Sequence, residues 1–210
     1  MHYTVLVLLL HVAFGSEFRH EQCPLWANSE FLAKYQSAWK TLNQTNTTRY
    51  FLTRSTYNSN PVWGKNFRCV NVRSVNVYPN QTVESLFTFK NGSGDEIYNV
   101  TDVVGVTSTY GYPTDNAIKY TLPNGTTLND SVIFTDGQTC DILSVPYENN
   151  GTGCELWVKQ EHLSETPLCC DFIFDAFCGK AGNYTVYHKD NCSNVLNVKD
   201  TSSNPTVQAS

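Results

Sequence analysis

From residue 50 onward, the chain is a succession of short segments rich in β-branched and aromatic residues, separated by turn sequences of hairpin length. Asn91-Gly92-Ser93-Gly94-Asp95 and Pro123-Asn124-Gly125 are two such turns. Eight consecutive strands joined in this way favour an antiparallel up-and-down barrel, because closure pairs the two edge strands. The expected strands span residues 50–57, 67–77, 82–90, 97–109, 117–122, 127–134, 140–147 and 154–159, and a further short strand spans 184–188.

Residues 28–42 have a different spacing, in which apolar side chains recur every three or four positions. That spacing predicts a helix with one apolar face. The helix would begin near Asn28 and end at the polar stretch 43–48. Its apolar face would consist of Phe31, Leu32, Tyr35, Ala38, Trp39 and Leu42.

A second helix is predicted for residues 166–180, where Thr166 can act as the cap, Pro167 suits the first turn and Gly179 can end the helix. The predicted fold class is therefore all-β: an eight-stranded antiparallel up-and-down barrel with an N-terminal helix and a C-terminal helix packed on its wall. The side chains of the second helix expected to face the barrel are Cys170, Phe174 and Phe177.

The N-terminal segment has the features of an export signal. Its apolar run from Val5 to Leu10 is too short to cross a bilayer, and small residues at Ala13 and Gly15 match a signal-cleavage pattern. The protein is therefore expected to be secreted. The predicted organisation is a signal peptide at residues 1–15, one barrel domain at 16–192 and a disordered polar tail at 193–210.

All eight cysteines follow the expected cleavage point. An even number of cysteines in an exported chain indicates disulfide bonds. Zinc binding is the rival interpretation, but the chain has no pair of C-x-x-C knuckles and few histidines, so no metal site is expected. The cysteines are Cys23, Cys69, Cys140, Cys154, Cys169, Cys170, Cys178 and Cys192.

Ten N-x-S/T triplets occur in the sequence, which predicts a glycoprotein. The triplet at Asn191 is a weaker candidate, because its middle residue is a cysteine. The other glycosylation candidates are Asn43, Asn46, Asn80, Asn91, Asn99, Asn124, Asn129, Asn150 and Asn183.

The net charge of −5 and the absence of a basic cluster argue against nucleic acid and anionic membranes as partners. No G-x-S-x-G, H-E-x-x-H or phosphate-loop motif is present, so we expect neither catalysis nor a cofactor. The expected partner is a small molecule, and the expected oligomeric state is a monomer.

Six short runs, in order along the chain, carry a resemblance to a known family. Together they resemble the tick salivary histamine-binding lipocalins, and the similarity covers Phe31 to about Cys192. The G-x-W opening of ordinary lipocalins is not evident, so the resemblance is to the tick branch. The runs are Ala38-Trp39-Lys40-Thr41-Leu42, Asn60-Pro61-Val62-Trp63-Gly64, Phe67-Arg68-Cys69-Val70, Tyr110-Gly111-Tyr112, Cys140-Asp141 and Glu155-Leu156-Trp157.

The resemblance implies the same eight-stranded barrel, with an N-terminal helix and a helix against its side. It also implies two disulfides, Cys69–Cys192 and Cys140–Cys170. For the four remaining cysteines we expect the pairs Cys154–Cys178 and Cys23–Cys169.

The family builds two amine sites inside the barrel, and one of them is partly retained here. Its carboxylate matches Glu155, whereas the family's second carboxylate falls on the neutral Asn60. Two stacking aromatics of the family fall on Ile118 and Leu128, which reduces ring contact and adds apolar surface. The matching aromatic positions are Tyr57, Trp63, Tyr120 and Trp157.

At the other site, Asp102 and Asp141 match the family's acids, while Thr45 stands where the family has a third acid and Thr41 keeps a hydroxyl. Because this site retains two carboxylates, the resemblance favours it for an amine. The residues alone leave a simpler alternative open, since carboxylates such as Glu155 are usually exposed. Likewise, tyrosines and tryptophans can be plain wall residues.

Three functions follow from these patterns. The first is a salivary scavenger of a host amine, histamine or serotonin, which would suppress host inflammatory and immune defence. The second is a carrier of a lipid mediator, a leukotriene or a sterol, favoured by the losses at Asn60, Thr45, Ile118 and Leu128. The third is a glycosylated scaffold that binds a host protein.

Overall fold

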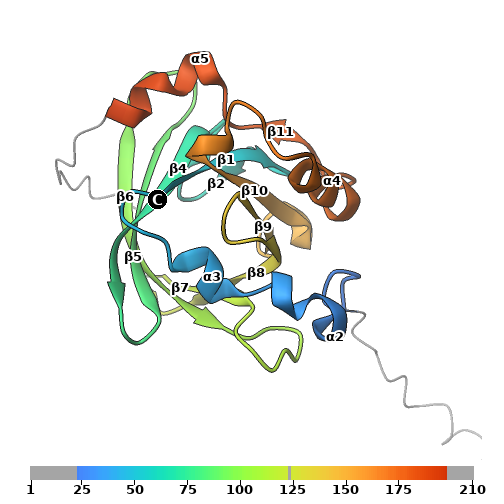
Figure 1. Cartoon of the computed structure of the whole chain (residues 1–210). Helices are drawn as coiled ribbons and strands as arrows, with labels where there is room; N and C mark the ends of the chain where they lie inside the picture. Colours follow the sequence, from blue (N-terminus) through green and yellow to red (C-terminus); the bar gives the residue numbers. More distant parts are fainter. Residues whose placement is uncertain (1–22, 123, 198–210) are drawn as a thin grey trace, which may run out of the picture.

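The computed structural model describes residues 23–122 and 124–197, so the expected signal peptide lies outside the described residues. Eight antiparallel strands follow one another around a barrel, and β10 pairs with β1 to close it (Figure 1). The predicted fold class is thereby confirmed. The barrel strands are β1 (Arg49–Ser55), β4 (Arg68–Tyr78), β5 (Thr82–Lys90), β6 (Tyr98–Thr107), β7 (Ala117–Thr121), β8 (Thr127–Thr135), β9 (Cys140–Val145) and β10 (Gly153–Lys159).

Three further short strands supplement the barrel. A small hairpin of β2 (Ser59–Asn60) and β3 (Gly64–Lys65) follows β1. Strand β4 pairs with the first half of β1, whereas β11 (Tyr184–Thr185) pairs with Arg54 and Ser55 in the second half. After its C-terminal helix the chain therefore returns to β1, and β11 pairs with the part of the β1 edge that β4 does not cover.

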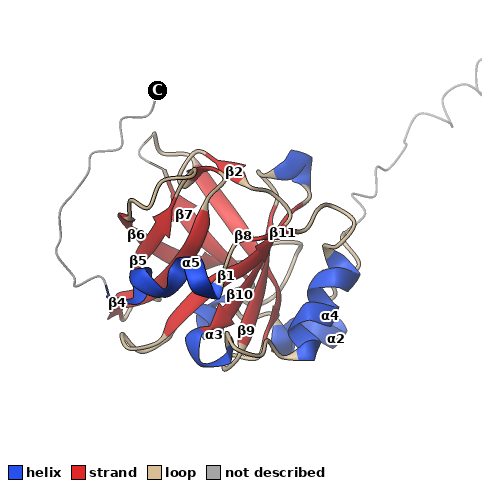
Figure 2. Ribbon diagram, turned by 90° about the horizontal axis from the view of Figure 1, so that it is seen from above, coloured by secondary structure: helices blue, strands red, loops and turns tan. Residues whose placement is uncertain are grey.

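Alternation along each strand sorts side chains between two cores. Inward positions such as Leu52, Val132 and Trp157 form the interior cluster. Outward positions of β8, β9 and β10, such as Ile142 and Leu156, form a second cluster beneath α4 (Leu168–Phe177). In Figure 2, α4 and α2 (Ser29–Leu32) lie on the same side of the barrel, and α5 (Lys189–Cys192) lies on another. The second cluster explains why β9 and β10 are buried on both faces.

Helix α4 is fixed to β1 by one cation. The Arg54 guanidinium forms ion pairs with Asp171, at 3.0 Å, and with Asp175, and it lies 4.5 Å from the centre of the Phe174 ring. Phe174 is fully buried, as predicted, but Phe177 is 41% exposed, which corrects the expectation that it faces the barrel. Cys178, four residues after Phe174, takes the inward position instead.

Three disulfides tie the helical segments to the barrel. Cys69–Cys192 and Cys140–Cys170 confirm the bridges implied by the resemblance, and Cys154–Cys178 confirms the third expected pair. The expected Cys23–Cys169 bridge is not formed, since both thiols are free and exposed. Adjacent residues on a helix point about 100° apart, so Cys170 can reach the barrel wall while Cys169 faces solvent.

The N-terminal segment is not one continuous helix. It consists of α2, the 3₁₀ turn η1 (Ala33–Tyr35) and α3 (Ala38–Leu42). The break occurs at Gln36 and Ser37: the Ser37 side chain caps α3, and the Gln36 side chain bonds to distant backbone. As a result Ala38 and Leu42 are buried, whereas Phe31 is 67% exposed, so the expected single apolar face is wrong in its first half.

Gln36 joins this segment to the barrel and the loop after β6. Its Nε2 donates to the carbonyls of Trp26, at 2.7 Å, and Ile133, at 3.0 Å, and its Oε1 accepts from the Tyr112 hydroxyl. Replacing it with Ala should lower the free energy of unfolding by about 1–3 kcal/mol, because buried groups lose their partners. Urea unfolding measures this cost. The matched change Gln138→Ala, in the exposed turn between β8 and β9, should cost less than about 0.5 kcal/mol; equal losses in both variants would contradict the assignment.

The C-terminal boundary also differs from expectation. The 3₁₀ helix η4 (Ser193–Asn197) continues directly from α5, and Val195 is fully buried against Phe51 and the Cys69–Cys192 bridge. The barrel domain therefore extends past residue 192, because an apolar side chain anchors the start of the segment expected to be a tail. The remaining 3₁₀ turns are η2 (Asn149–Gly151) and η3 (Gln160–His162). Within the described residues, no helix has the length and apolar character needed to cross a bilayer.

Candidate functional site

Two adjoining cavities occupy the barrel interior. We name them the Glu155 chamber, of about 170 Å³, and the Asp141 chamber, of about 60 Å³. The rings of Phe87, Tyr120 and Trp157 line both chambers and form the partition between them. The larger volume makes the Glu155 chamber the better candidate for a ligand with an aromatic ring.

Glu155 lies inside the barrel because of its position in β10. Its neighbours Cys154 and Leu156 belong to the outer cluster, so alternation turns Glu155 and Trp157 inward. The Tyr57 hydroxyl donates to Glu155 Oε1, and Trp157 Nε1 donates to Oε2 at 2.8 Å. Glu155 is 3% exposed, and the exposed alternative for this residue is excluded.

Aromatic rings surround this carboxyl group. Trp63 comes from the β2–β3 hairpin, and its ring centre lies 6.2 Å from that of Trp157 and 5.0 Å from that of Phe67. The Asn60 side chain holds the hairpin, because its Oδ1 accepts from the backbone nitrogens of Val62 and Trp63. Asn60 therefore positions an aromatic wall residue, although it supplies no charge.

Asp130 is a carboxyl group of this chamber that sequence reasoning missed. It lies on β8 between Leu128 and Val132, is 3% exposed, and its Oδ1 has no hydrogen-bond partner. The signal was available: alternation places Asp130 on the same face as Leu128, which the resemblance had already placed at the site.

Two more carboxyl groups complete the acidic lining. Asp102, on β6, is half-buried, and its own backbone neighbour Val103 donates to Oδ1 at 2.8 Å. Glu148 lines the same chamber from the β9–β10 connection. Among the described residues that line the Glu155 chamber, none is Lys, Arg or His. The chamber is therefore acidic without an internal counter-ion.

Burial changes the protonation of these acids. Desolvation raises the pKa of Glu155 to about 7, although hydrogen bonds from Tyr57 and Trp157 oppose the rise. The pKa of Asp130 is raised well above its ordinary value, first by desolvation and then by the charge of Glu155. Two carboxylates that share a dry cavity repel each other, so the empty chamber holds a proton near neutral pH.

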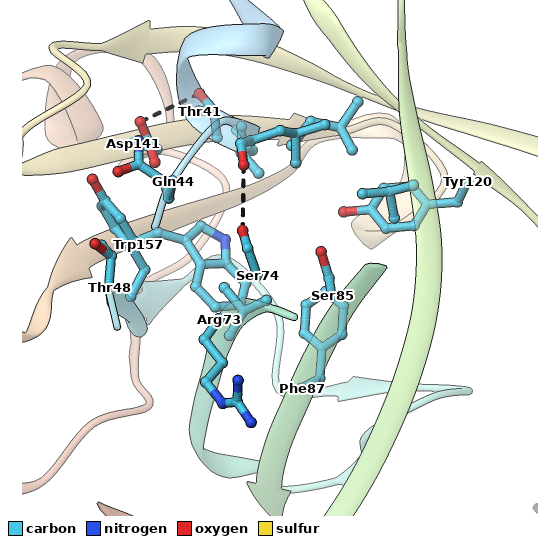
Figure 3. A pocket seen from close by; sticks show the side chains of 16 residues that line it. Thr41, Gln44, Thr48, Arg73, Ser74, Ser85, Phe87, Tyr120, Asp141 and Trp157 are labelled. Carbon is cyan, nitrogen blue, oxygen red and sulfur yellow. Dashed lines mark hydrogen bonds between the residues drawn. The ribbon is translucent and has the colours of Figure 1, made fainter. Parts of the chain in front are cut away.

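The Asp141 chamber is smaller and has one carboxyl group (Figure 3). Asp141 on β9 is 3% exposed, and Thr41 of α3 donates to its Oδ1 at 3.3 Å. Desolvation raises the pKa of Asp141 to about 7. The Arg73 guanidinium points away from Asp141 in Figure 3, and the buried Tyr50 hydroxyl has no hydrogen-bond partner. This chamber has the polarity for a small hydrogen-bonding guest.

The structure divides the expected sites differently from the sequence. Asp102 and Asp141, expected to share a site, line different chambers. Ile118 belongs to the Asp141 chamber rather than to that of Leu128, and Thr45 is exposed and lines neither. The order of the motifs along the chain does not reveal which chamber each side chain lines, because that depends on the three-dimensional arrangement of the strands. The residues that do come together are Tyr57, Trp63, Tyr120, Glu155 and Trp157.

Among the described residues, no group of three or more His, Cys, Asp or Glu side chains is arranged to hold a metal ion. The arrangement fits a different guest: a cation whose charge the acids neutralise and whose body the rings contact.

Comparison with solved structures shows the same fold. The crystal structure of the AM182 serotonin complex matches with a TM-score of 0.55 and 23% identity, covering 74% of this chain and 91% of that chain. At this identity the similarity concerns the architecture.

Sequence comparisons reach further. A male-specific histamine-binding salivary protein of Rhipicephalus appendiculatus is 33% identical over 82% of this chain and 87% of its own length. Female-specific histamine-binding protein 1 of the same tick is 31% identical over 87% of this chain and 97% of its own length. The family model for tick histamine binding protein matches residues 26–194. With this match across nearly the whole barrel, the chain belongs to the tick histamine-binding protein family.

Proposed function

We propose that this protein is a secreted scavenger that captures a protonated host amine in the Glu155 chamber, and that it acts by binding rather than by catalysis. The observation that carries the proposal is a set of four carboxyl groups, Asp102, Asp130, Glu148 and Glu155, around an aromatic cavity whose described lining has no basic side chain. Relatives named for histamine binding, and a similar fold crystallised with serotonin, support an aromatic amine as the guest.

The physical basis is the transfer of a charge into a prepared cavity. An ammonium group that enters beside Glu155 and Asp130 supplies the missing counter-charge, and a charge-assisted hydrogen bond contributes about 1.5–3 kcal/mol. The faces of Trp63 and Trp157 add about 0.5–2 kcal/mol each by cation–π attraction. A neutral ligand of equal shape gains none of these electrostatic contributions.

Calorimetric titration tests the proposal with charged and uncharged ligands of the same ring. Histamine is compared with 4-methylimidazole, and serotonin with 5-hydroxyindole, because each second compound lacks the ammonium group. We expect binding of at least one amine and a loss of about tenfold or more for its uncharged analogue. Equal affinity for both members of each pair, or no heat from any amine, would refute capture by charge.

Replacing Glu155 with Gln should weaken amine binding by about ten- to a hundredfold, because a buried charge is lost while the shape is kept. The measurement is the dissociation constant at pH 7.4. The control is Glu84→Gln. It removes one carboxylate from β5, directly before the inward-facing Ser85, at a position that is not part of the lining of either chamber. If both variants bind like the unmodified protein, Glu155 is not the anchor.

A lipid mediator is the alternative favoured by apolar wall positions such as Val100, Leu122 and Leu128. The four carboxyl groups oppose it, since an apolar guest would leave them unpaired. Native mass spectrometry of the secreted protein separates the two, because a retained lipid adds a discrete mass. A host-protein scaffold, the third alternative, needs no occupied chamber, and a pull-down from host serum would test it.

Secretion, signal cleavage after residue 15 and glycosylation belong to the same proposal. Among the asparagines in sequons, Asn91, Asn99 and Asn129 are half-buried, and the Oδ1 of Asn129 is buried without a partner. The exposed asparagines include Asn43, Asn80 and Asn150. Peptide mapping of the secreted protein should find glycans at exposed sites and none at Asn129.

A further inference from the structure

Asp130 has a feature that the other acids of the Glu155 chamber lack. Its carboxyl group is buried, and its Oδ1 has no hydrogen-bond partner. Both oxygens of Glu155 are already engaged by Tyr57 and Trp157, and Asp102 Oδ1 accepts from a backbone nitrogen. Asp102 and Glu148 are only half-buried, so water can reach them, and the buried acceptor without a partner is on Asp130.

A buried carboxyl oxygen without a partner is unfavourable, because desolvation is not offset by a hydrogen bond. No described basic side chain lines the chamber to relieve it. Asn60 offers no further open acceptor through Oδ1, which already accepts from the backbone nitrogens of Val62 and Trp63. A donor on a bound ligand can complete the hydrogen bonding of Asp130 Oδ1.

Asp130 and Glu155 lie in one chamber but on strands that are not neighbours, since β9 lies between β8 and β10. Tyr120 and Tyr147 stand close to Asp130, and each contributes a hydrogen bond that favours its charged form. A ligand with one polar group beside each acid can meet both of them. A ring between those groups would contact the aromatic wall.

We propose that Asp130 is a second hydrogen-bonding pole of the Glu155 chamber, and that its free Oδ1 selects amines that carry an additional N–H or O–H donor apart from the ammonium group. This inference rests on the proposed function and deepens it. Glu155 then attracts the ammonium group, which every amine has, and Asp130 discriminates among amines by their second donor. Aromatic monoamines without a second donor would leave Asp130 Oδ1 without a partner and bind less tightly.

The variant Asp130→Asn tests the proposal with two ligands of similar size. Histamine has an ammonium group and a ring N–H, whereas 2-phenylethylamine has an ammonium group alone. We expect Asp130→Asn to weaken histamine binding by about ten- to a hundredfold and phenylethylamine binding by less than about threefold. Glu155→Gln should weaken both ligands, and Glu84→Gln should weaken neither.

The outcomes distinguish failure of amine capture from failure of selection by Asp130. If the unmodified protein binds neither amine, the proposed function fails. If it binds both and Asp130→Asn leaves histamine affinity unchanged, or reduces both ligands equally, selection by Asp130 is wrong while amine capture stands.

A measurement on the unmodified protein covers the case in which Asp130→Asn does not fold. Histamine methylated at one or the other ring nitrogen keeps its ammonium group but loses that ring donor. Both compounds should bind about tenfold more weakly than histamine, because a neutral imidazole methylated at either nitrogen has no N–H. Equal affinities for histamine and both methylated forms would overturn the proposal.

Discussion

The empty protein should unfold at a lower temperature at pH 8 than at pH 5. Glu155 and Asp141 are buried carboxyl groups, and desolvation raises the pKa of each to about 7. In the unfolded chain both groups have ordinary pKa values near 4. The folded state therefore binds more protons than the unfolded state between about pH 4 and pH 7, and its stability falls as pH rises through that interval.

The expected loss is several kcal/mol in the free energy of unfolding between pH 5 and pH 8, since each unit of pKa shift corresponds to about 1.4 kcal/mol. Asp130, whose pKa is raised in the same direction, adds to it. Thermal unfolding measured by circular dichroism across this range checks the prediction. An amine that supplies the counter-charge should restore stability most strongly at pH 8.

The matched variant is Glu155→Gln combined with Asp141→Asn, which keeps the shape of both chambers and removes two titrating groups. Its melting temperature should depend much less on pH over the same interval. A profile as steep as that of the unmodified protein would mean that other groups cause the pH dependence.

Replacement of Trp157 with Ala should have the largest effect of any single change in the interior. The ring is 5% exposed, lies in the partition between the chambers and donates from Nε1 to Glu155 at 2.8 Å. Truncation of a buried aromatic costs about 3–5 kcal/mol in stability. It also removes a cation–π face and the donor that orients Glu155, so amine affinity should fall at least tenfold.

Trp26 provides the control for this variant. It is buried to a similar degree, at 6% exposure, but belongs to the cluster outside the barrel wall. Trp26→Ala should therefore cost comparable stability, measured by urea unfolding, and leave the affinity of the folded protein unchanged. Should both variants lose affinity in parallel, the effect of Trp157 would come from general loosening of the barrel rather than from contact with the ligand.

The barrel could be predicted because its strands obey one local rule. Alternation of period two places Leu52, Val132 and Trp157 inside and Ile142 outside, and hairpin turns leave antiparallel neighbours as the simplest pairing. The break at Gln36 could not be predicted in the same way. It depends on bonds to Trp26 and Ile133, and Ile133 is 97 residues distant along the chain.

The site was partly predictable for a related reason. The resemblance identified Tyr57, Trp63, Glu155 and Trp157, and these residues do meet in one chamber. It did not reveal which chamber each side chain lines, and so Asp102 and Asp141 were assigned to a common site, although they line different chambers. The burial of Asp130 and the missing partner of its Oδ1 likewise depend on the folded structure and cannot be seen in the sequence.

The three rings between the chambers, Phe87, Tyr120 and Trp157, have a consequence for how the barrel fills. If a guest in one chamber tilts Trp157, the space offered by the other changes, and occupancy of the two chambers is then thermodynamically linked. The linkage is reciprocal: whatever factor the first guest imposes on the second, the second imposes on the first. A large ligand on one side can thus lower the capacity of the protein to one molecule, without any steric overlap between the two guests.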